Sequence, residues 1–426
     1  MGFTEEIGTA EAQRAQREEQ REAIAYLRSP VAIRERCGVL FALGCEDKLG
    51  HFRCDLAGLG RVADYVIGVI RDQYPDLEIP FHSRWRHFEA GGIPRLAHLD
   101  RVLSSLTPIE KAQAQFDLVI TSVLLDAGAG ECWQYYEKET DRVFCRSEGL
   151  AVASFHMFCQ GAFSSNPKQL CLADAQGLQG LTSQALADGF QVGSENPLVG
   201  LAGRLELLQR LGRSLLSAPH MFGDENPRPG KLVNYLLELS SNGRLAAETV
   251  LSAVLEGLAQ IWPGRVEIAG VNLGDVWPHP ALTDDGLGAG FVPFHKLSQW
   301  LTYSLLEPLQ ELGLEITGLD ALTGLPEYRN GGLCLDLGLL QAKHPAVLHE
   351  RHSVGSEVIV EWRALTVILL DRIAEAVREE LGMNAEELPL VKILQGGTWS
   401  AGRRIAAELR TGGIPPIRLE SDGTVF

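Results

Sequence analysis

The sequence lacks long apolar runs, so it offers no segment of the length that a membrane span requires. Its longest apolar stretches, such as ALTVILL at 364–370, fall well short of the roughly 20 residues that a transmembrane helix needs. The first residues, GFTEEIGTAEAQRAQREEQREAIAYL, are polar and contain no apolar core of a signal peptide. We therefore expect a soluble, cytoplasmic protein that has no membrane as a partner.

Several common catalytic and cofactor signatures are also missing. The chain has no Walker A sequence, no G-x-S-x-G, no H-E-x-x-H and no C-x-x-C pair. Its eight cysteines are therefore expected to be reduced thiols, and no cofactor is expected. Three histidines lie close together in the sequence, at His344, His349 and His352, and the last two are spaced to share one face of a helix. The group of Cys37, Cys45, His51 and Cys54 matches no common zinc spacing.

Positive charge is scarce. Lys and Arg number 38 against 55 Asp and Glu, which gives a formal net charge of −17. A surface of this sign repels phosphate backbones and argues against nucleic acid as a partner. A small anionic substrate remains compatible, because a few arginines can line one pocket while the rest of the surface stays acidic.

What the sequence does contain is apolar spacing of helical period. Strand signals are limited to 266–268 and 417–426, and no βαβ alternation appears. The prediction is a mostly α protein with few short strands, in which 1–28 form a peripheral helix and 29–426 a single large helical catalytic domain. The helices are predicted over 9–27, 29–45, 55–74 and 107–128, and near 148–162, 197–216, 231–240, 244–261, 294–312, 356–381 and 398–410.

Two segments combine charged groups with aromatic ones. The first, IPFHSRWRHF at 79–88, is predicted to be a loop, and its arginines are suited to phosphate and its rings to a stacking wall. In the second, Asp126 ends an apolar helix and is followed by small residues and Trp133. A poorly solvated carboxylate there suits a general base or a stabiliser of positive charge. The alternatives are a loop with solvated cations and a helix end capped by Gly128.

Two further segments are ambiguous. Ser147 is expected to be the N-cap of a helix, although Arg146 before it has the chemistry to face a ligand. The run LTGLPEYRNGG at 322–332 places Glu327, Tyr328 and Arg329 in a Gly/Pro loop, which is a usual place for site residues. A surface turn with a local ion pair explains the same run equally well.

Five runs of the sequence resemble the uracil-catabolism (URC/URG) family of fungi and bacteria. The resemblance implies a role in uracil breakdown through a ribosylated, ring-opened intermediate, and it extends from about Ser29 to Phe426. The runs are IPFHSRWRHFEAGGIPR, SVLLDAGAGECWQYYE, RSEGLAVASFHMF, GDVWPH and the terminal SDGTVF.

A more distant resemblance is to the queuosine salvage N-glycohydrolases, an all-helical group related in architecture to DNA glycosylases. It rests on FHKLSQWLTYSL, LPEYRNGG, EVIVEWRALTVILLDRI and LLDAGAG. Here Glu327 stands where that group has Asp, and Asn-Gly-Gly follows Arg329 instead of an apolar residue and proline. The site residues that this resemblance implies are Asp126, Gln299, Glu327, Arg329, Glu361 and Arg363.

Together these features predict hydrolysis of the N-glycosidic bond of a ribosylurea-phosphate-like substrate. Asp126 and Glu327 are the expected catalytic carboxylates. The expected proton donors are His82, His87 or Arg329. The expected phosphate ligands are Arg84, Arg86 and Lys296, and the expected water-excluding rings are Trp85, Trp133 and Trp300.

Two other functions remain open at this point, as does the oligomeric state. One is a non-catalytic protein that binds a uracil-derived nucleotide and regulates a partner enzyme. The other is a metal-dependent amidohydrolase that uses the cluster between His344 and His352.

Overall fold

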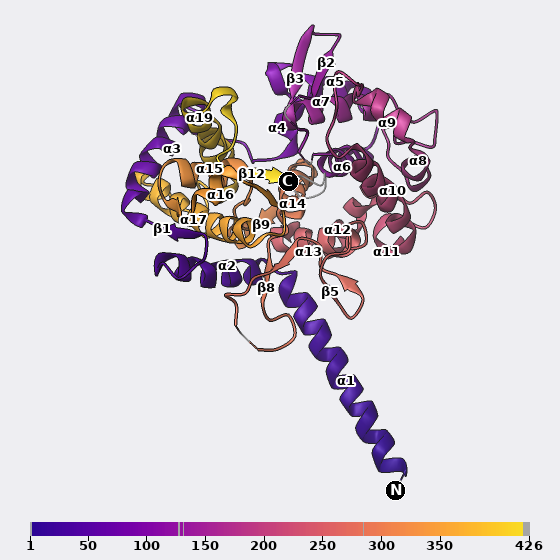
Figure 1. Cartoon of the computed structure of the whole chain (residues 1–426). Helices are drawn as coiled ribbons and strands as arrows, with labels where there is room; N and C mark the ends of the chain where they lie inside the picture. Colours follow the sequence, from indigo (N-terminus) through magenta and orange to yellow (C-terminus); the bar gives the residue numbers. More distant parts are fainter. Residues whose placement is uncertain (1, 127, 131, 284, 421–426) are drawn as a thin grey trace.

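The chain folds mainly into α-helices, which confirms the mostly α prediction (Figure 1). The computed structural model describes residues 2–126, 128–130, 132–283 and 285–420, with side chains from residue 13 onward. The finer likeness to the glycosylase architecture stays a prediction.

The helices fall into three groups by length. The longer ones are α1 (Gly2–Leu27), α2 (Pro30–Cys45), α3 (Leu59–Gln73), α6 (Pro108–Leu124), α7 (Arg146–Cys159), α10 (Leu201–Ser217), α13 (Ala247–Gly257), α14 (Lys296–Glu311), α17 (Glu357–Leu381) and α19 (Trp399–Leu409). The shorter ones are α4 (Arg84–Phe88), α5 (Arg95–Val102), α8 (Ala175–Gly180), α9 (Ser183–Gly189), α11 (Pro219–Phe222), α12 (Leu232–Leu239), α15 (Tyr328–Asp336), α16 (Pro345–His349) and α18 (Leu390–Ile393). Short 3₁₀ turns form η1 (Leu56–Gly58), η2 (Ala90–Gly92), η3 (Pro229–Lys231), η4 (Leu319–Ala321) and η6 (Thr411–Gly413), and η5 (Leu394–Thr398) is a π-helical turn.

Strands among the described residues are two to four residues long and occur only in pairs. Two pairs, β4 with β9 and β11 with β12, are parallel, and the others are antiparallel. The antiparallel pairs are β1 (Phe52–Cys54) with β10 (Leu340–Ala342), β2 (Gln134–Glu137) with β3 (Arg142–Cys145), β5 (Glu267–Ile268) with β6 (Val271–Asn272), and β7 (Val276–Pro278) with β8 (Phe291–Pro293). The parallel pairs are β4 (Arg244–Ala246) with β9 (Glu315–Thr317), and β11 (Arg351–Ser353) with β12 (Arg418–Glu420).

Capping residues explain why two of the long helices start where the sequence predicts. Ser29 accepts the Ala32 N–H, and Pro30 occupies the first helical position of α2. At α6, Thr107 and Glu110 form a reciprocal capping box. These side chains satisfy N–H groups that a helix start otherwise leaves unpaired.

One large apolar core joins the helices. In it α17 packs against α2, α3 and α15, and α14 packs against α6 and α13. The C-terminal strand β12 lies between the helices at the left and those at the right of Figure 1. The helix α1 extends away from this body, and in its last turns Ala23 and Leu27 pack with Ile268 in a small separate cluster.

Several sequence-based boundaries were wrong. The helix predicted to reach Gly128 ends at Leu124, so Asp126 follows the helix. The segments 79–88 and 322–332, expected to be loops, contain the short helix α4 (Arg84–Phe88) and the start of the short helix α15 (Tyr328–Asp336). The predicted strand over 417–426 is β12, Arg418–Glu420, and its remainder, SDGTVF, lies outside the described residues.

Within the described part of the chain, none of the helices has an apolar stretch long enough to cross a lipid bilayer.

Candidate functional site

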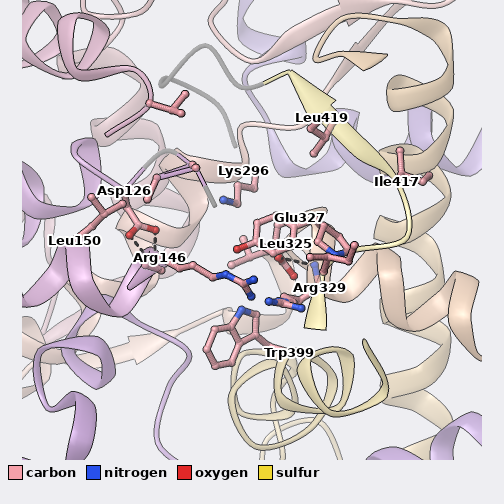
Figure 2. Close-up of a pocket in the computed structure, with 18 of the residues that line it drawn as sticks. Asp126, Arg146, Leu150, Lys296, Leu325, Glu327, Arg329, Trp399, Ile417 and Leu419 are labelled. Atoms are coloured by element: carbon pink, nitrogen blue, oxygen red, sulfur yellow. Dashed lines mark hydrogen bonds between the residues drawn. The ribbon is translucent and has the colours of Figure 1, made fainter. Parts of the chain in front are cut away.

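A cavity of about 900 Å³ opens among α4, α7, α14, α15, α19 and the C-terminal segment (Figure 2). Its size suits a small metabolite. Seven of the residues expected from the sequence line it: His82, His87, Asp126, Lys296, Trp300, Glu327 and Arg329. The structure therefore brings together side chains that lie more than 200 residues apart in the chain.

Asp126 is fixed from two sides. Ser147 Oγ lies 2.6 and 2.7 Å from the two carboxylate oxygens and donates its proton to them. Arg84 Nη1 lies 2.5 Å from Oδ1, and the Arg84 side chain is fully buried. Burial lowers the pKa of Arg84, and the Asp126 charge acts against this shift. The carboxylate thus has a fixed orientation at the wall of the cavity.

The serine that makes this contact is not a helix cap, contrary to the sequence-based expectation. The helix α7 starts at Arg146 after Cys145, so Ser147 lies inside its first turn. Arg146 has a φ of 54°, a left-handed conformation that is unusual for a residue other than glycine. This backbone turn places both Arg146 and Ser147 at the cavity.

Two buried histidines contribute rings to the same wall. Burial lowers the pKa of His82 to about 4, and its Nδ1 lies 2.9 Å from Gln395 Oε1. Burial also lowers the pKa of His87 well below its ordinary value, and the neighbouring Arg84 cation adds to the shift. Both imidazoles are therefore neutral at pH 7.

His87 is the more notable of the two because its Nε2 is buried and has no hydrogen-bond partner among the described residues. Its other nitrogen, Nδ1, lies 3.2 Å from Ser147 Oγ and 3.5 Å from Arg84 Nη1. The ring is held between Trp300 and Trp399, with centroid separations of 5.4 and 5.5 Å. A buried polar atom without a partner is unfavourable, so this nitrogen is a candidate ligand contact of the cavity wall.

Glu327 caps the helix α15. Its carboxylate accepts the N–H groups of Arg329 at 2.7 Å and Asn330 at 2.6 Å. Burial raises the pKa of Glu327, and these N–H groups act against the shift. The same N-cap geometry directs the following Tyr328 and Arg329 to the cavity wall.

Lys296 lies near both carboxylates. It begins α14 directly after His295, whose φ of 47° is again left-handed. Burial lowers the pKa of Lys296, and the negative charges of Glu327 and then Asp126 act against the shift. The Lys296 ammonium group therefore interacts electrostatically with both carboxylates of the cavity.

Two guanidinium groups converge on the floor of the cavity. Arg146 Nη2 donates to Gly412 O at 3.2 Å, and Arg329 Nη1 donates to Gly413 O at 2.8 Å. Figure 2 shows the two groups side by side below Glu327 and next to Trp399. Burial lowers the pKa of Arg329, and the Arg146 cation acts in the same direction. In the described part of the chain neither forms an ion pair with a carboxylate.

Four of the residues expected at the site do not line the cavity, namely Trp85, Arg86, Trp133 and Gln299. Because 84–88 is a helix and not a loop, successive side chains point in different directions. Arg86 pairs with Glu307 at 2.9 Å. The indole N–H groups of Trp85 and Trp133 donate to Ser304 O and Phe190 O, and Gln299 bonds with Thr323.

Glu361 and Arg363, which the resemblance to the N-glycohydrolases placed at the site, also lie outside the cavity. Glu361 accepts three backbone N–H groups at residues 50–52, and Arg363 forms two hydrogen bonds of 2.8 and 2.7 Å to Asp275. Arg84 stands behind the wall and contacts the cavity-lining residues Asp126 and Ser147. Arg84, Glu361 and Arg363 do not line the cavity, so the direct substrate contacts expected of them are not supported by their positions.

The histidines at 344–352 do not form one cluster. His344 Nε2 faces Gly50 O and His352 Nε2 faces Val347 O, while His349 is exposed. Among the described residues, the group that the structure does bring to metal-binding distance contains none of the three.

Sequence reasoning missed part of the site. Trp399 lines the cavity, as do Ile414, Pro415 and residues 417–420 of the C-terminal segment. The φ at Arg146 is a structural signal that no residue pattern reveals, and the C-terminal stretch reaches the cavity only through the pairing of β12 with β11.

Comparison with known proteins gives the family. The family described as "Protein of unknown function (DUF1688)" matches residues 26–426. The chain belongs to this family. It is 39% identical over 414 residues to "Protein urg3" of Schizosaccharomyces pombe, which covers 95% of this chain and 99% of the relative. It is also 39% identical over 438 residues to "Uracil catabolism protein 4" of Lachancea kluyveri, with the same coverage. These relatives confirm the resemblance to the URC/URG family.

Proposed function

We propose that this chain is an enzyme of uracil catabolism that hydrolyses an N-glycosidic bond in a phosphorylated ribosyl substrate, such as ribosylurea 5-phosphate. The relative named "Uracil catabolism protein 4" supports the pathway. The reaction is supported by one observation above the others. Asp126 and Glu327 line a single cavity whose floor carries two guanidinium groups without carboxylate partners among the described residues.

The carboxylates suit the charge that this reaction develops. When the bond from C1 of ribose to nitrogen breaks, positive charge builds on C1 and the ring oxygen. Asp126, held by Ser147 and Arg84, offers a fixed negative charge that is favourable mainly in the transition state. Water adds its hydroxyl to C1, and its second proton leaves with the urea nitrogen.

Glu327 is the second acid of the site. Because two of its lone pairs already accept backbone N–H groups, its remaining capacity suits a ribose hydroxyl. Lys296 between the two acids limits their mutual repulsion. Glu327 therefore orients the sugar while Asp126 faces the reacting carbon.

The leaving urea takes up the second proton of the attacking water, and a hydrogen bond from the protein assists its departure. His87 lines the cavity, and its Nε2 has no partner among the described residues, so we assign the hydrogen bond to the urea group to this nitrogen. A neutral imidazole donor has no positive charge that would oppose the developing cation.

The anionic tail of the substrate is assigned to Arg146 and Arg329 instead of Arg84 and Arg86, because the latter two already have carboxylate partners. Two adjacent guanidinium groups repel each other unless an anion lies between them, and their planar forks match phosphate oxygens. Backbone carbonyls at Gly412 and Gly413 fix the forks in place.

Turnover by the purified protein tests the proposal directly. We expect urea and ribose 5-phosphate from ribosylurea 5-phosphate by mass spectrometry, and slower reaction with unphosphorylated ribosylurea. Stabilisation of the protein by the substrate without any product would support the alternative function as a binding and regulatory protein. If the substrate gives no product and does not stabilise the protein, both functions are contradicted.

A further inference from the structure

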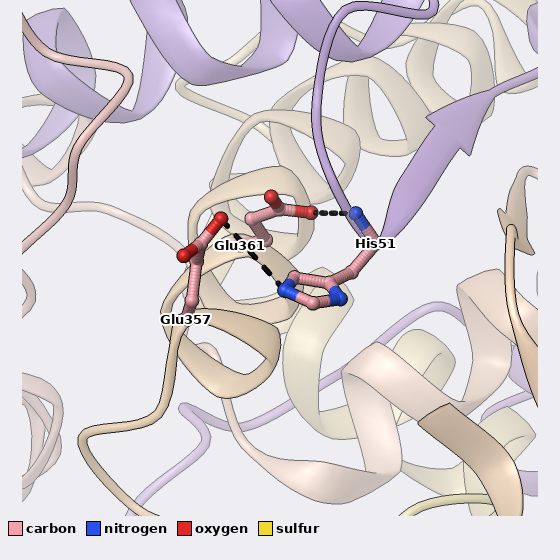
Figure 3. A group of neighbouring side chains, drawn as sticks. All are labelled: His51, Glu357 and Glu361. Atoms are coloured by element: carbon pink, nitrogen blue, oxygen red, sulfur yellow. Dashed lines mark hydrogen bonds and ion pairs between the residues drawn. The ribbon is translucent and has the colours of Figure 1, made fainter. Parts of the chain in front are cut away.

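A second cluster of ligand-type side chains lies outside this cavity, where the segment before β1 meets the start of α17 (Figure 3). It contains His51, Glu357 and Glu361. One nitrogen of His51 and one oxygen of each glutamate lie within 4.8 Å of one another. The two glutamates are four residues apart on α17, so they share one face of the helix.

The negative charge of this cluster is not balanced by Lys or Arg. Within the described part of the chain, the ion-pair partners of Glu357 and Glu361 are only histidines, His51 and His279. Glu361 is fully buried and accepts three backbone N–H groups at 3.0 to 3.2 Å, which compensate its charge only in part. A buried carboxylate next to a second one is favourable only with a nearby cation.

Gly50 keeps side-chain atoms away from the two carboxylates. A Cβ atom at this position would lie 3.2 Å from Glu357 Oε1 and 3.5 Å from Glu361 Oε1. The glycine therefore leaves both carboxylate oxygens uncrowded by a side chain at residue 50. His51 Nε2 is 3.7 Å from Glu357 Oε1, which is too long for a hydrogen bond and leaves room between the two atoms.

His279 supplies an independent sign of a ligand. It is 2% exposed, and its Nδ1 accepts the Ala281 N–H at 3.2 Å, so the proton lies on Nε2. This Nε2 has no hydrogen-bond partner and lies 3.7 Å from Glu361 Oε1. An unsatisfied buried donor is unfavourable, and a water molecule bound to a metal ion at the cluster would satisfy it.

We propose that His51, Glu357 and Glu361 bind one divalent transition-metal ion, with water in the remaining position. One imidazole nitrogen and two carboxylate oxygens form a donor set suited to Zn²⁺. Since His51 and Glu357 are partly exposed, the ion can enter from solvent. The site joins two segments that are distant in the sequence and does not depend on the hydrolytic reaction proposed above.

Titration of chelator-treated full-length protein with Zn²⁺, followed by calorimetry, tests this site. We expect one Zn²⁺ per chain and a higher melting temperature of the loaded protein. Mg²⁺ in parallel should bind much more weakly, because the site has a nitrogen ligand and only two carboxylates. His51→Ala and Glu357→Gln should each weaken Zn²⁺ binding by at least about tenfold, since each removes a direct ligand.

Matched controls separate this site from general metal binding. His349→Ala and Glu380→Gln change an exposed histidine and an exposed glutamate of α17 away from the cluster, and should leave Zn²⁺ binding unchanged. Gly50→Ala should weaken it by crowding both carboxylate oxygens. Circular dichroism confirms that each variant is folded. Wild-type protein without saturable Zn²⁺ binding, or equal affinity in folded His51→Ala and Glu357→Gln, would overturn the proposal.

Discussion

Arg84 and Asp126 form a buried ion pair in the wall of the cavity, with Nη1 2.5 Å from Oδ1 and the arginine side chain fully buried. The pair connects stability with the proposed chemistry. The same contact that orients the carboxylate toward the cavity also neutralises a guanidinium that water does not reach.

Removing the cation of this pair should destabilise the protein. Arg84→Met leaves the Asp126 charge uncompensated, and we expect the free energy of unfolding to fall by about 3–5 kcal/mol. Urea denaturation measures the difference. As a control, Arg404→Met breaks an exposed pair with Asp72 and should change the free energy of unfolding by less than about 1 kcal/mol. Equal effects of the two variants would show that burial does not govern the Arg84 pair.

The assignment of the anion site predicts a selective loss of substrate binding. Arg146→Gln and Arg329→Gln each remove a charge-assisted contact worth about 1.5–3 kcal/mol, or about a 10- to 150-fold rise in KM for the phosphorylated substrate. Inorganic phosphate should inhibit the wild type more strongly than either variant, because it binds the same two guanidinium groups. Arg372→Gln, in an exposed pair with Glu375, is the control and should leave KM unchanged. A KM unaltered in both site variants would refute the assignment.

Stability should depend on pH through His82. Its pKa is about 4 in the folded protein, against an ordinary value of 6.5, because burial disfavours the charged ring. Between these values the unfolded chain binds a proton that the folded chain does not. The free energy of unfolding therefore falls as pH decreases from 6.5 to 4, by about 3 kcal/mol in total, and this loss levels off below.

Comparison of pH profiles isolates this contribution from those of other groups. Urea denaturation at several pH values should give a shallower slope for His82→Asn than for the wild type between pH 6.5 and 4. His98→Asn, at an exposed position, should keep the wild-type slope. A parallel profile for His82→Asn would mean that the ring is not buried in its neutral form.

Close packing of α19 against α15 should matter for the position of Arg329. A Cβ at Gly402 would lie 2.2 Å from the Arg329 carbonyl oxygen, so Gly402→Ala must push the two helices apart. We expect a loss of about 1–3 kcal/mol in stability, together with a higher KM for the substrate. Gly38→Ala, in the helix α2 with open space around its Cβ position, should instead be neutral or stabilising by up to about 1 kcal/mol. Thermal melting of both variants provides the test, and an undisturbed Gly402→Ala protein would contradict the packing argument.

The sequence predicted the long helices well because their signals are local. Ser29 and Thr107 mark helix starts, and the apolar spacing of α3 gives one buried face. The short helix α4 was not predicted because its five residues are too few to show a helical period. The helix α15 was not predicted because the Gly-Gly pair within it is more typical of a loop. Their misassignment explains why Arg86 and Trp85 were placed at the site together with their neighbours.

The convergence of Asp126 and Glu327 on one cavity had to come from tertiary structure. Each residue has a local role that is visible in the sequence, at a helix end or in a turn, but no local pattern shows that both line one cavity with Lys296. The contribution of Arg146 depends on a left-handed backbone conformation, which the sequence does not indicate for arginine.

Release of urea and ribose 5-phosphate by wild type and Asp126→Asn, compared by mass spectrometry at equal protein concentration, is the most direct test. The amide oxygen of Asn still accepts hydrogen bonds from Ser147 and Arg84, so the variant should fold, with lower stability because Arg84 loses its counter-ion, while its rate falls by about 10²–10³-fold. Asp72→Asn, at an exposed position, should keep the wild-type rate. Undiminished product release by folded Asp126→Asn would contradict the account.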